Sequence, residues 1–172
     1  MDLLDRLLGH DDWTTRLLLQ RCDELTDEQL DRPFDIGHRT VRQTLHHIIF
    51  NIDVWADLMA GEQVRLDHTP GSVQALLSRF NEASSKLSRI ARAVADRGGW
   101  NEEWTDILDT PPAEKTYGSG IAHIITHSMH HRAQLLYMLH QLGLEGLPEG
   151  DVFSWESRSK LMPGESSGPT LR

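Results

Sequence analysis

Four stretches of helical periodicity constrain the fold of this 172-residue chain more than any other feature. In each stretch, apolar residues recur at intervals of three and four residues, the spacing of one face of an α-helix. The pattern predicts helices over about residues 3–25, 40–60, 72–95 and 119–142. Since we find no convincing strand run and no internal repeat, the sequence predicts an all-α four-helix bundle.

The segments between and after these helices set the domain limits. Thr40 and Gly61 are a typical N-cap and C-cap for the second helix. The segment 100–120 carries aromatic residues, threonines and a Pro-Pro turn, which predicts a short hairpin or irregular insert. A last short helix is expected in "DVFSWESRSKL", before a flexible tail over 161–172. We therefore expect one domain over residues 1–160.

The charge and the single cysteine exclude several classes of protein. The chain has 17 Lys and Arg against 26 Asp and Glu, a formal charge of −9, which argues against binding to nucleic acid or an anionic membrane. Cys22, the only cysteine, allows no intrachain disulfide and is expected to be a packing residue of the first helix. No signal peptide and no membrane-spanning apolar run is visible, so we expect a cytoplasmic protein.

The stretch "HIITHSMHHR", residues 123–132, holds four of the ten histidines. At about 100° per residue, His131 lies next to the apolar stripe of the fourth helix and His127 lies further round on the same flank. His123 and His130 lie toward the side opposite the core. Because His127 and His131 are one turn apart, their imidazoles can converge on one metal ion.

A third ligand must come from another helix, and the second helix offers His46 and His47 in "LHHII". These two residues flank the apolar centre of that helix on opposite sides, so periodicity does not choose between them. Three neutral imidazoles from facing helices hold Zn²⁺ or Ni²⁺ and leave coordination positions open. The competing interpretation is a chance pair of packed, hydrogen-bonded histidines. The remaining histidines have no partner at a useful spacing and are expected on the surface or in loops: His10, His38, His68 and His140.

Two motifs resemble the DinB-like family of four-helix-bundle metal proteins, which includes YfiT-like and mycothiol-dependent maleylpyruvate isomerase-like proteins. "TVRQTLHHIIFNIDVWADLMAG" is similar to the family's Leu-x-His-Ile/Val segment, and "YGSGIAHIITHSMHHRAQLLYMLHQLG" to its His-x-x-x-His-Arg-Gly-Gln segment. The resemblance covers about 140 residues. It implies that His47, His127 and His131 are the metal ligands. The family's glycine after His-Arg is Ala133 here, which is also small and leaves the ligands unaffected.

The resemblance also implies Ni²⁺ or Zn²⁺ in the site, and a homodimer. Characterised members of the family include enzymes that use low-molecular-weight thiols as S-transferases or isomerases. The first hypothesis is therefore a metal-dependent S-transferase or hydrolase that acts on a small molecule with such a thiol or a metal-bound water. The alternatives are a non-catalytic metal-binding stress-response protein and a helical interaction module without metal.

Several other residues are weaker candidates for roles around the site. Asn51 and Asp53 follow His47 and could orient an imidazole, although capping or solvated roles are more common. Further residues could line a pocket, pack in the core or lie at a surface: Gln134, Arg132, Tyr117, Trp55, Trp100, Trp104 and Trp155. The sequence assigns no general base.

Overall fold

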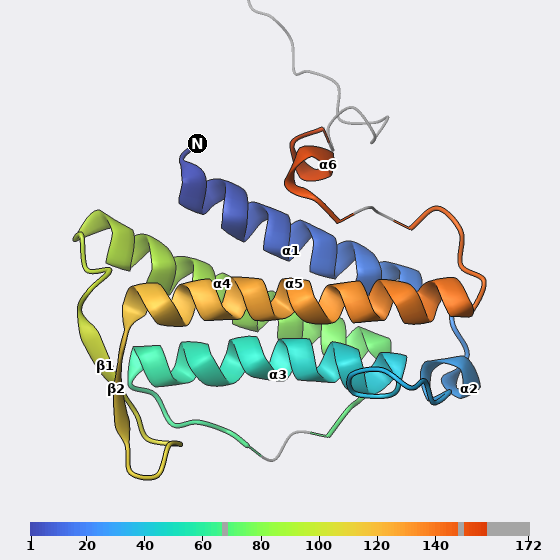
Figure 1. Ribbon diagram of the computed structural model, residues 1–172, viewed down its shortest axis with the longest axis horizontal. Helices are drawn as coiled ribbons and strands as arrows, with labels where there is room; N and C mark the ends of the chain where they lie inside the picture. Colours follow the sequence, from blue (N-terminus) through green and yellow to red (C-terminus); the bar gives the residue numbers. More distant parts are fainter. Residues whose placement is uncertain (67–68, 148–149, 158–172) are drawn as a thin grey trace, which may run out of the picture.

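All four long helices that the periodicity predicts are present. The computed structural model of the chain describes residues 1–66, 69–147 and 150–157. The long helices are α1 (Leu3–Cys22), α3 (Val41–Ala60), α4 (Val73–Asp96) and α5 (Tyr117–Gln141). They run side by side, and α3 contacts both α4 and α5 (Figure 1). The predicted all-α four-helix bundle is confirmed.

Polar side chains begin the helices and glycine ends one of them. Thr40 accepts a hydrogen bond from the backbone N–H of Gln43 at 3.1 Å and so starts α3. Gly61 ends this helix with a φ of +66°, a left-handed conformation that glycine adopts without steric cost. Both predicted caps of the second predicted helix are therefore confirmed.

The insert before α5 is a hairpin, which was one of the two predicted possibilities. Its strands β1 (Glu103–Asp106) and β2 (Ala113–Thr116) pair in antiparallel fashion, and β2 leads directly into α5. Two short helices complete the fold: α2 (Asp27–Leu30) and α6 (Val152–Glu156). The sequence predicted α6 but not α2. The predicted tail, 161–172, lies outside the described residues.

The core of the bundle lies around α3, whose side chains are buried on several faces. Leu45, Ile48, Ile49 and Ile52 are fully buried there. Cys22 is also buried, and its burial raises the pKa of the thiol to about 12, as suits a packing residue. Within the described ranges, no helix has both the length and the apolar character needed to cross a membrane.

A buried ion pair links α5 to α1. The guanidinium of Arg132 donates hydrogen bonds to the Asp11 carboxylate and, at 3.0 Å, to the Thr15 hydroxyl. Both charged side chains are buried, at 3% and 5% exposure. Because Arg132 directly follows His131, this pair fixes the rotation of α5 at the turn that presents His131 toward α3.

Candidate metal centre

Imidazoles from two facing helices approach one another in the bundle, with His127 in contact with both His47 and His131. Nε2 of His127 lies 3.3 Å from Nε2 of His47 and 3.2 Å from Nε2 of His131. His47 comes from α3, whereas His127 and His131 lie one turn apart on α5. The structure thus brings His127 next to His47 and His131, the three histidines that the family resemblance implies as metal ligands.

The spacing of these nitrogens suits a metal ion. Imidazole nitrogens bound at about 2.0–2.1 Å in a tetrahedral arrangement lie about 3.4 Å from one another. The two distances from His127 Nε2, 3.3 and 3.2 Å, match that separation. The donor set, three imidazoles, suits Zn²⁺ and Ni²⁺ rather than Mg²⁺ or Ca²⁺, which prefer oxygen ligands.

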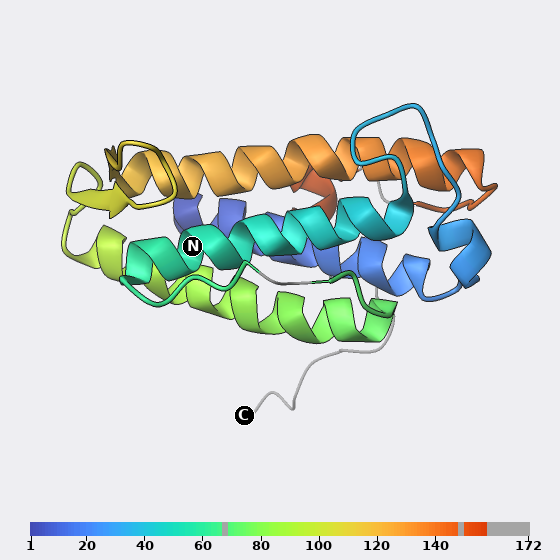
Figure 2. The ribbon, with the colours of Figure 1, turned by 90° about the horizontal axis from the view of Figure 1, so that it is seen from below.

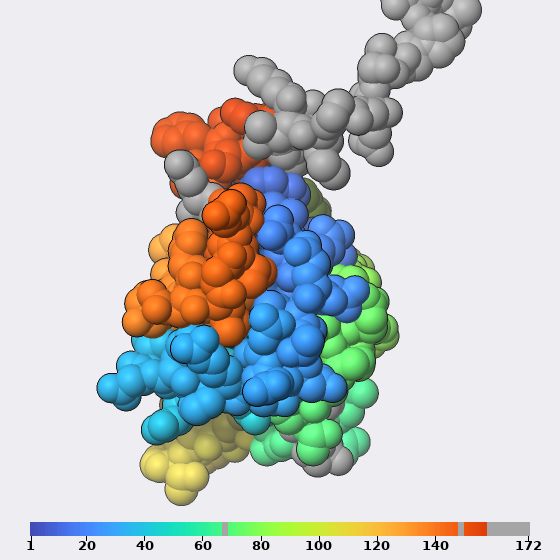
Figure 3. Space-filling model, turned by 90° about the vertical axis from the view of Figure 1, so that its right-hand side faces the viewer, coloured from blue at the N-terminus to red at the C-terminus, as the bar shows by residue number. Residues whose placement is uncertain are grey.

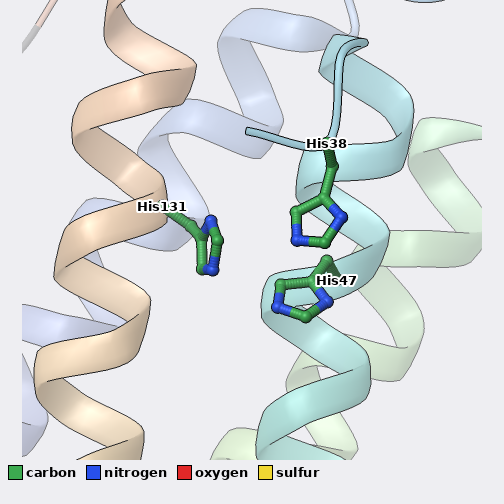
Figure 4. A group of neighbouring side chains, drawn as sticks. All are labelled: His38, His47 and His131. Atoms are coloured by element: carbon green, nitrogen blue, oxygen red, sulfur yellow. The ribbon is translucent and has the colours of Figure 1, made fainter. Parts of the chain in front are cut away.

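His38 joins this group, which the sequence did not predict. One nitrogen each of His38, His47 and His131 lie within 4.8 Å of one another, and Figure 4 shows their rings between α3 and α5. The His38 ring stacks on that of His47, with centroids 3.7 Å apart. The expectation that His38 lacks a partner is wrong. A periodicity argument misses it because the residue lies in the loop before α3, where no helical spacing relates it to the other histidines.

The loop that carries His38 crosses from α2 to α3. Figure 2 shows residues 31–40 as a blue loop near the end of the bundle where α5 finishes, and Figure 3 shows their surface beside that of α5. Gly37 has a φ of +50° and Arg39 a φ of +70°, so the backbone turns sharply on both sides of His38. These turns direct the side chain of His38 back over α3.

Burial keeps the imidazoles neutral. Desolvation first, and then the charges that the neighbouring imidazoles would carry, lower the pKa of His47 to about 3 and that of His127 to about 4. Burial also lowers the pKa of His131 and of His38. At neutral pH these rings therefore hold free lone pairs, which is the form that binds metal.

Gln134 orients His131 from outside the group. The Nδ1–H of His131 donates to Oε1 of Gln134 at 2.9 Å, which leaves Nε2 as the nitrogen that faces His127. The amide of Gln134 also hydrogen-bonds His130 Nε2 at 2.9 Å. Of the candidate pocket residues, Gln134 is therefore the one that contacts the histidine group through a hydrogen bond.

The other histidines divide between surface and packing positions. His46 stacks on Phe50, with ring centroids 5.8 Å apart, so the structure brings His47 rather than His46 to His127. His123, His130 and His140 are exposed, the first two as the helical wheel predicts. The prediction that His10 lies on the surface or in a loop is wrong. This residue of α1 is buried, and its Nε2 hydrogen-bonds the Gly150 carbonyl at 2.6 Å. His68 lies outside the described residues.

The other residues that the sequence offered as neighbours of the site do not contact the histidine group through a hydrogen bond. Asp53 lies 3.9 Å from Arg79, and the Tyr117 hydroxyl donates to the Met59 carbonyl at 3.2 Å. Arg132 is engaged in the ion pair with α1. The side-chain oxygen of Asn51 is buried without a hydrogen-bond partner, so it orients no imidazole in this structure.

Comparisons with known proteins agree with the fold. The fold is similar to the crystal structure of a DinB-like protein from Bacillus cereus ATCC 10987, with a TM-score of 0.61 and 19% identity over 81% of this chain and 89% of that chain. At that identity the similarity shows the fold alone. No curated protein matches the chain. The model of the DinB family matches residues 1–155, which include all four long helices and all but the last residue of α6, and the chain therefore belongs to the DinB family.

Proposed function

We propose that the chain is a divalent-metal protein whose site, formed by His47, His127 and His131, serves chemistry on a small molecule. The observation that supports the proposal is the position of His127, whose Nε2 lies 3.3 Å from Nε2 of His47 and 3.2 Å from Nε2 of His131. Membership of the DinB family and the neutral state of the imidazoles support it.

The protein's own residues set up the site in three ways. The two turns of α5 and the facing turn of α3 hold the imidazoles at fixed spacing. Gln134 selects the tautomer of His131 that presents Nε2. A Zn²⁺ or Ni²⁺ ion held by the three nitrogens would supply Lewis acidity and lower the pKa of a thiol or water at an open position.

The finer activity is that of a metal-dependent S-transferase or hydrolase, with a low-molecular-weight thiol or water as nucleophile. Cys22, the only cysteine, is buried in the core and lies in neither site motif, so a thiol would have to come from a cosubstrate. The homodimer that the family resemblance implies remains a prediction.

One observation favours a second candidate function. His38 brings a fourth imidazole to the group, and four protein nitrogens would close a tetrahedral site and leave no position for substrate. The protein would then bind metal without catalysis, as the stress-response alternative requires.

Elemental analysis of protein purified without a histidine tag tests the proposal. We expect about one Zn²⁺ or Ni²⁺ per chain, lost in the variants His47→Ala, His127→Ala and His131→Ala. The matched control is His140→Ala, an exposed histidine of the same helix. If the protein binds no metal after incubation with either ion, or if the control loses metal equally, the proposal is wrong.

A further inference from the structure

Two buried polar atoms, one on α3 and one on α5, have no hydrogen-bond partner among the described residues. They are the side-chain oxygen Oδ1 of Asn51 and Nδ1 of His127. Buried polar atoms are nearly always paired, so each unpaired atom needs a physical explanation. Nδ1 of His131, by contrast, donates to Gln134 at 2.9 Å. His127 therefore lacks the hydrogen bond on its second nitrogen that a metal-binding imidazole normally makes.

Two ring contacts fix the register of α3 against α5, which pack side by side (Figure 1). The ring centroid of His47 lies 4.6 Å from that of His131, and the ring centroid of Trp55 lies 5.5 Å from that of His123. From the first contact to the second, the chain advances by eight residues on α3 and goes back by eight residues on α5. The two helices therefore run antiparallel, and each turn of α3 between the contacts faces a turn of α5.

Asn51 and His127 lie midway between these two contacts. Asn51 is one turn from each of the two contacting residues of α3, and His127 is one turn from each of the two contacting residues of α5. The register therefore places Asn51 opposite His127, between the two pairs of rings. Both side chains are half-buried, and their unpaired atoms are the parts shielded from solvent. Side chains of helices packed at about 8–10 Å between axes are within hydrogen-bonding reach of each other.

The hydrogen bonds of the histidines explain why these two atoms are unpaired. His131 donates its Nδ1–H to Gln134, so its Nε2 carries a lone pair. Nε2 of His127 lies 3.2 Å from that nitrogen and is therefore the donor of this contact. Because a neutral imidazole has one N–H proton, Nδ1 of His127 has none. Nδ1 and the oxygen of Asn51 are then both acceptors, and two acceptors form no hydrogen bond.

Metal binding through Nε2 reverses the role of Nδ1. Nε2 of His127 can bind a metal ion only through its lone pair. The proton of the neutral ring then moves from Nε2 to Nδ1, and the charge of the ring does not change. Nδ1–H is now a buried donor, and the facing oxygen of Asn51 is a buried acceptor. A hydrogen bond between them satisfies both atoms.

We infer that Asn51 is a positioning residue of the metal centre, which accepts the Nδ1–H of His127 when Nε2 of His127 binds the metal. Each of the two histidines of α5 then has an amide partner, Gln134 for His131 and Asn51 for His127. The hydrogen bond forms only with the tautomer that binds metal, so it stabilises the metal-bound form selectively. The inference rests on the proposed function, because it requires a metal ion on His127.

The affinity of three variants for Zn²⁺, measured by competition with a chromophoric chelator, tests the inference. Asn51→Leu removes the acceptor at nearly constant size and should weaken binding by about 10-fold or more. Asn51→Asp keeps an acceptor on a side chain of the same length and should restore most of the affinity. The matched control Gln43→Leu removes an exposed amide of the same helix and should have no effect.

Two further measurements separate a positioning role from a structural one. In ¹⁵N NMR spectra, the imidazole of His127 should carry its proton on Nε2 in protein stripped of metal and on Nδ1 in Zn²⁺-loaded protein. Stripped Asn51→Leu should be at least as stable to urea as the stripped unmodified protein, because the oxygen that it loses has no partner among the described residues. A residue that only holds α3 against α5 would instead lose stability on this change.

The contrary outcomes distinguish this inference from the proposed function. If the unmodified protein binds Zn²⁺ and Asn51→Leu binds it equally tightly, the inference alone is refuted. It is also refuted if stripped Asn51→Leu is less stable than the unmodified protein, or if His127 keeps its proton on Nε2 in the loaded protein. If the unmodified protein binds no Zn²⁺ at all, the proposed function fails, and the inference fails with it.

Discussion

Gln134 accepts the Nδ1–H of His131 at 2.9 Å, and this single contact decides which nitrogen of His131 faces the other histidines. Residues that hold a ligating imidazole in this way affect metal affinity by about 10–100-fold. Replacing Gln134 by Leu should therefore weaken binding of Zn²⁺ by about 10-fold or more, as measured by competition with a chromophoric chelator.

Two variants control for this result. Gln134→Glu keeps an acceptor of the same length and should restore most of the affinity. Gln141→Leu makes the same change at an exposed position of the same helix and should have no effect. If Gln134→Leu binds Zn²⁺ as tightly as the unmodified protein, the side chain has no positioning role.

The structure holds two overlapping triads, and they predict different mutational results. His127 lies on a helix at 3.3 and 3.2 Å from two partner nitrogens, whereas His38 lies on a loop and forms, with His47 and His131, a group whose nitrogens lie within 4.8 Å of one another. We expect His127→Ala to abolish stoichiometric metal binding and His38→Ala to retain it with lower affinity. The reverse order of affinities would assign the ligand role to the loop histidine.

The visible spectrum of bound Co²⁺ reports whether His38 coordinates. If it is a fourth ligand, replacement of His38 by Ala exchanges a nitrogen for water and changes the intensity of the absorption bands. An unchanged spectrum would mean that His38 stacks on His47 without binding the metal. In that case the site is open, as the enzymatic proposal requires.

How far the sequence predicted this site depends on the kind of element that carries each residue. His127 and His131 were predictable because a helix relates residues at i and i+4 by fixed geometry. His47 was identified as a ligand only through the family resemblance, because the helical wheel did not distinguish it from His46. His38 was not predictable, because a loop places its side chains through backbone turns and tertiary contacts that no periodicity encodes.

Gly37 anchors the loop that carries His38. It has a φ of +50°, and a Cβ at this position would collide with Oε1 of Gln134. Gly37→Ala should destabilise the metal-free protein by more than the ~1–2 kcal/mol that a left-handed conformation costs an ordinary residue. The matched control is Gly61→Ala, with a φ of +66° and no atom within 4 Å of the added Cβ.

Urea unfolding measures both glycine variants. The excess loss for Gly37→Ala over Gly61→Ala isolates the contact with Gln134 from the backbone strain. Equal losses would show that the loop or the end of the Gln134 side chain moves aside without cost, and that this contact does not hold the loop.

The buried pair of Arg132 and Asp11 should be costly to break from one side. Replacing Asp11 by Ala leaves a buried guanidinium unpaired, and we expect a loss of about 3–5 kcal/mol in the free energy of unfolding. The double variant Asp11→Leu with Arg132→Met removes both charges and should be clearly more stable than the single variant. If Asp11→Ala costs less than about 1 kcal/mol, the pair contributes no more than a surface ion pair.

The low pKa values of the histidines predict how the stability of the metal-free protein depends on pH. In the unfolded chain these imidazoles titrate near 6.5, but in the folded protein His47 titrates at about 3 and His127 at about 4. Between these values the unfolded chain binds more protons than the folded protein, so acid favours unfolding. The stability that these neutral imidazoles contribute is fully present above pH 6.5 and is lost progressively as the pH falls toward 4.

Urea unfolding between pH 7.5 and pH 4.5 measures this dependence. Replacing His47 by Gln, which does not titrate, should make the slope below pH 6.5 shallower, because one fewer proton is taken up on unfolding. The control His140→Gln changes an exposed histidine and should leave the slope as it is. If the dependence of stability on pH is unchanged in His47→Gln, the imidazole of His47 can be protonated in the folded protein. Burial then does not keep this ring in the neutral form that binds metal.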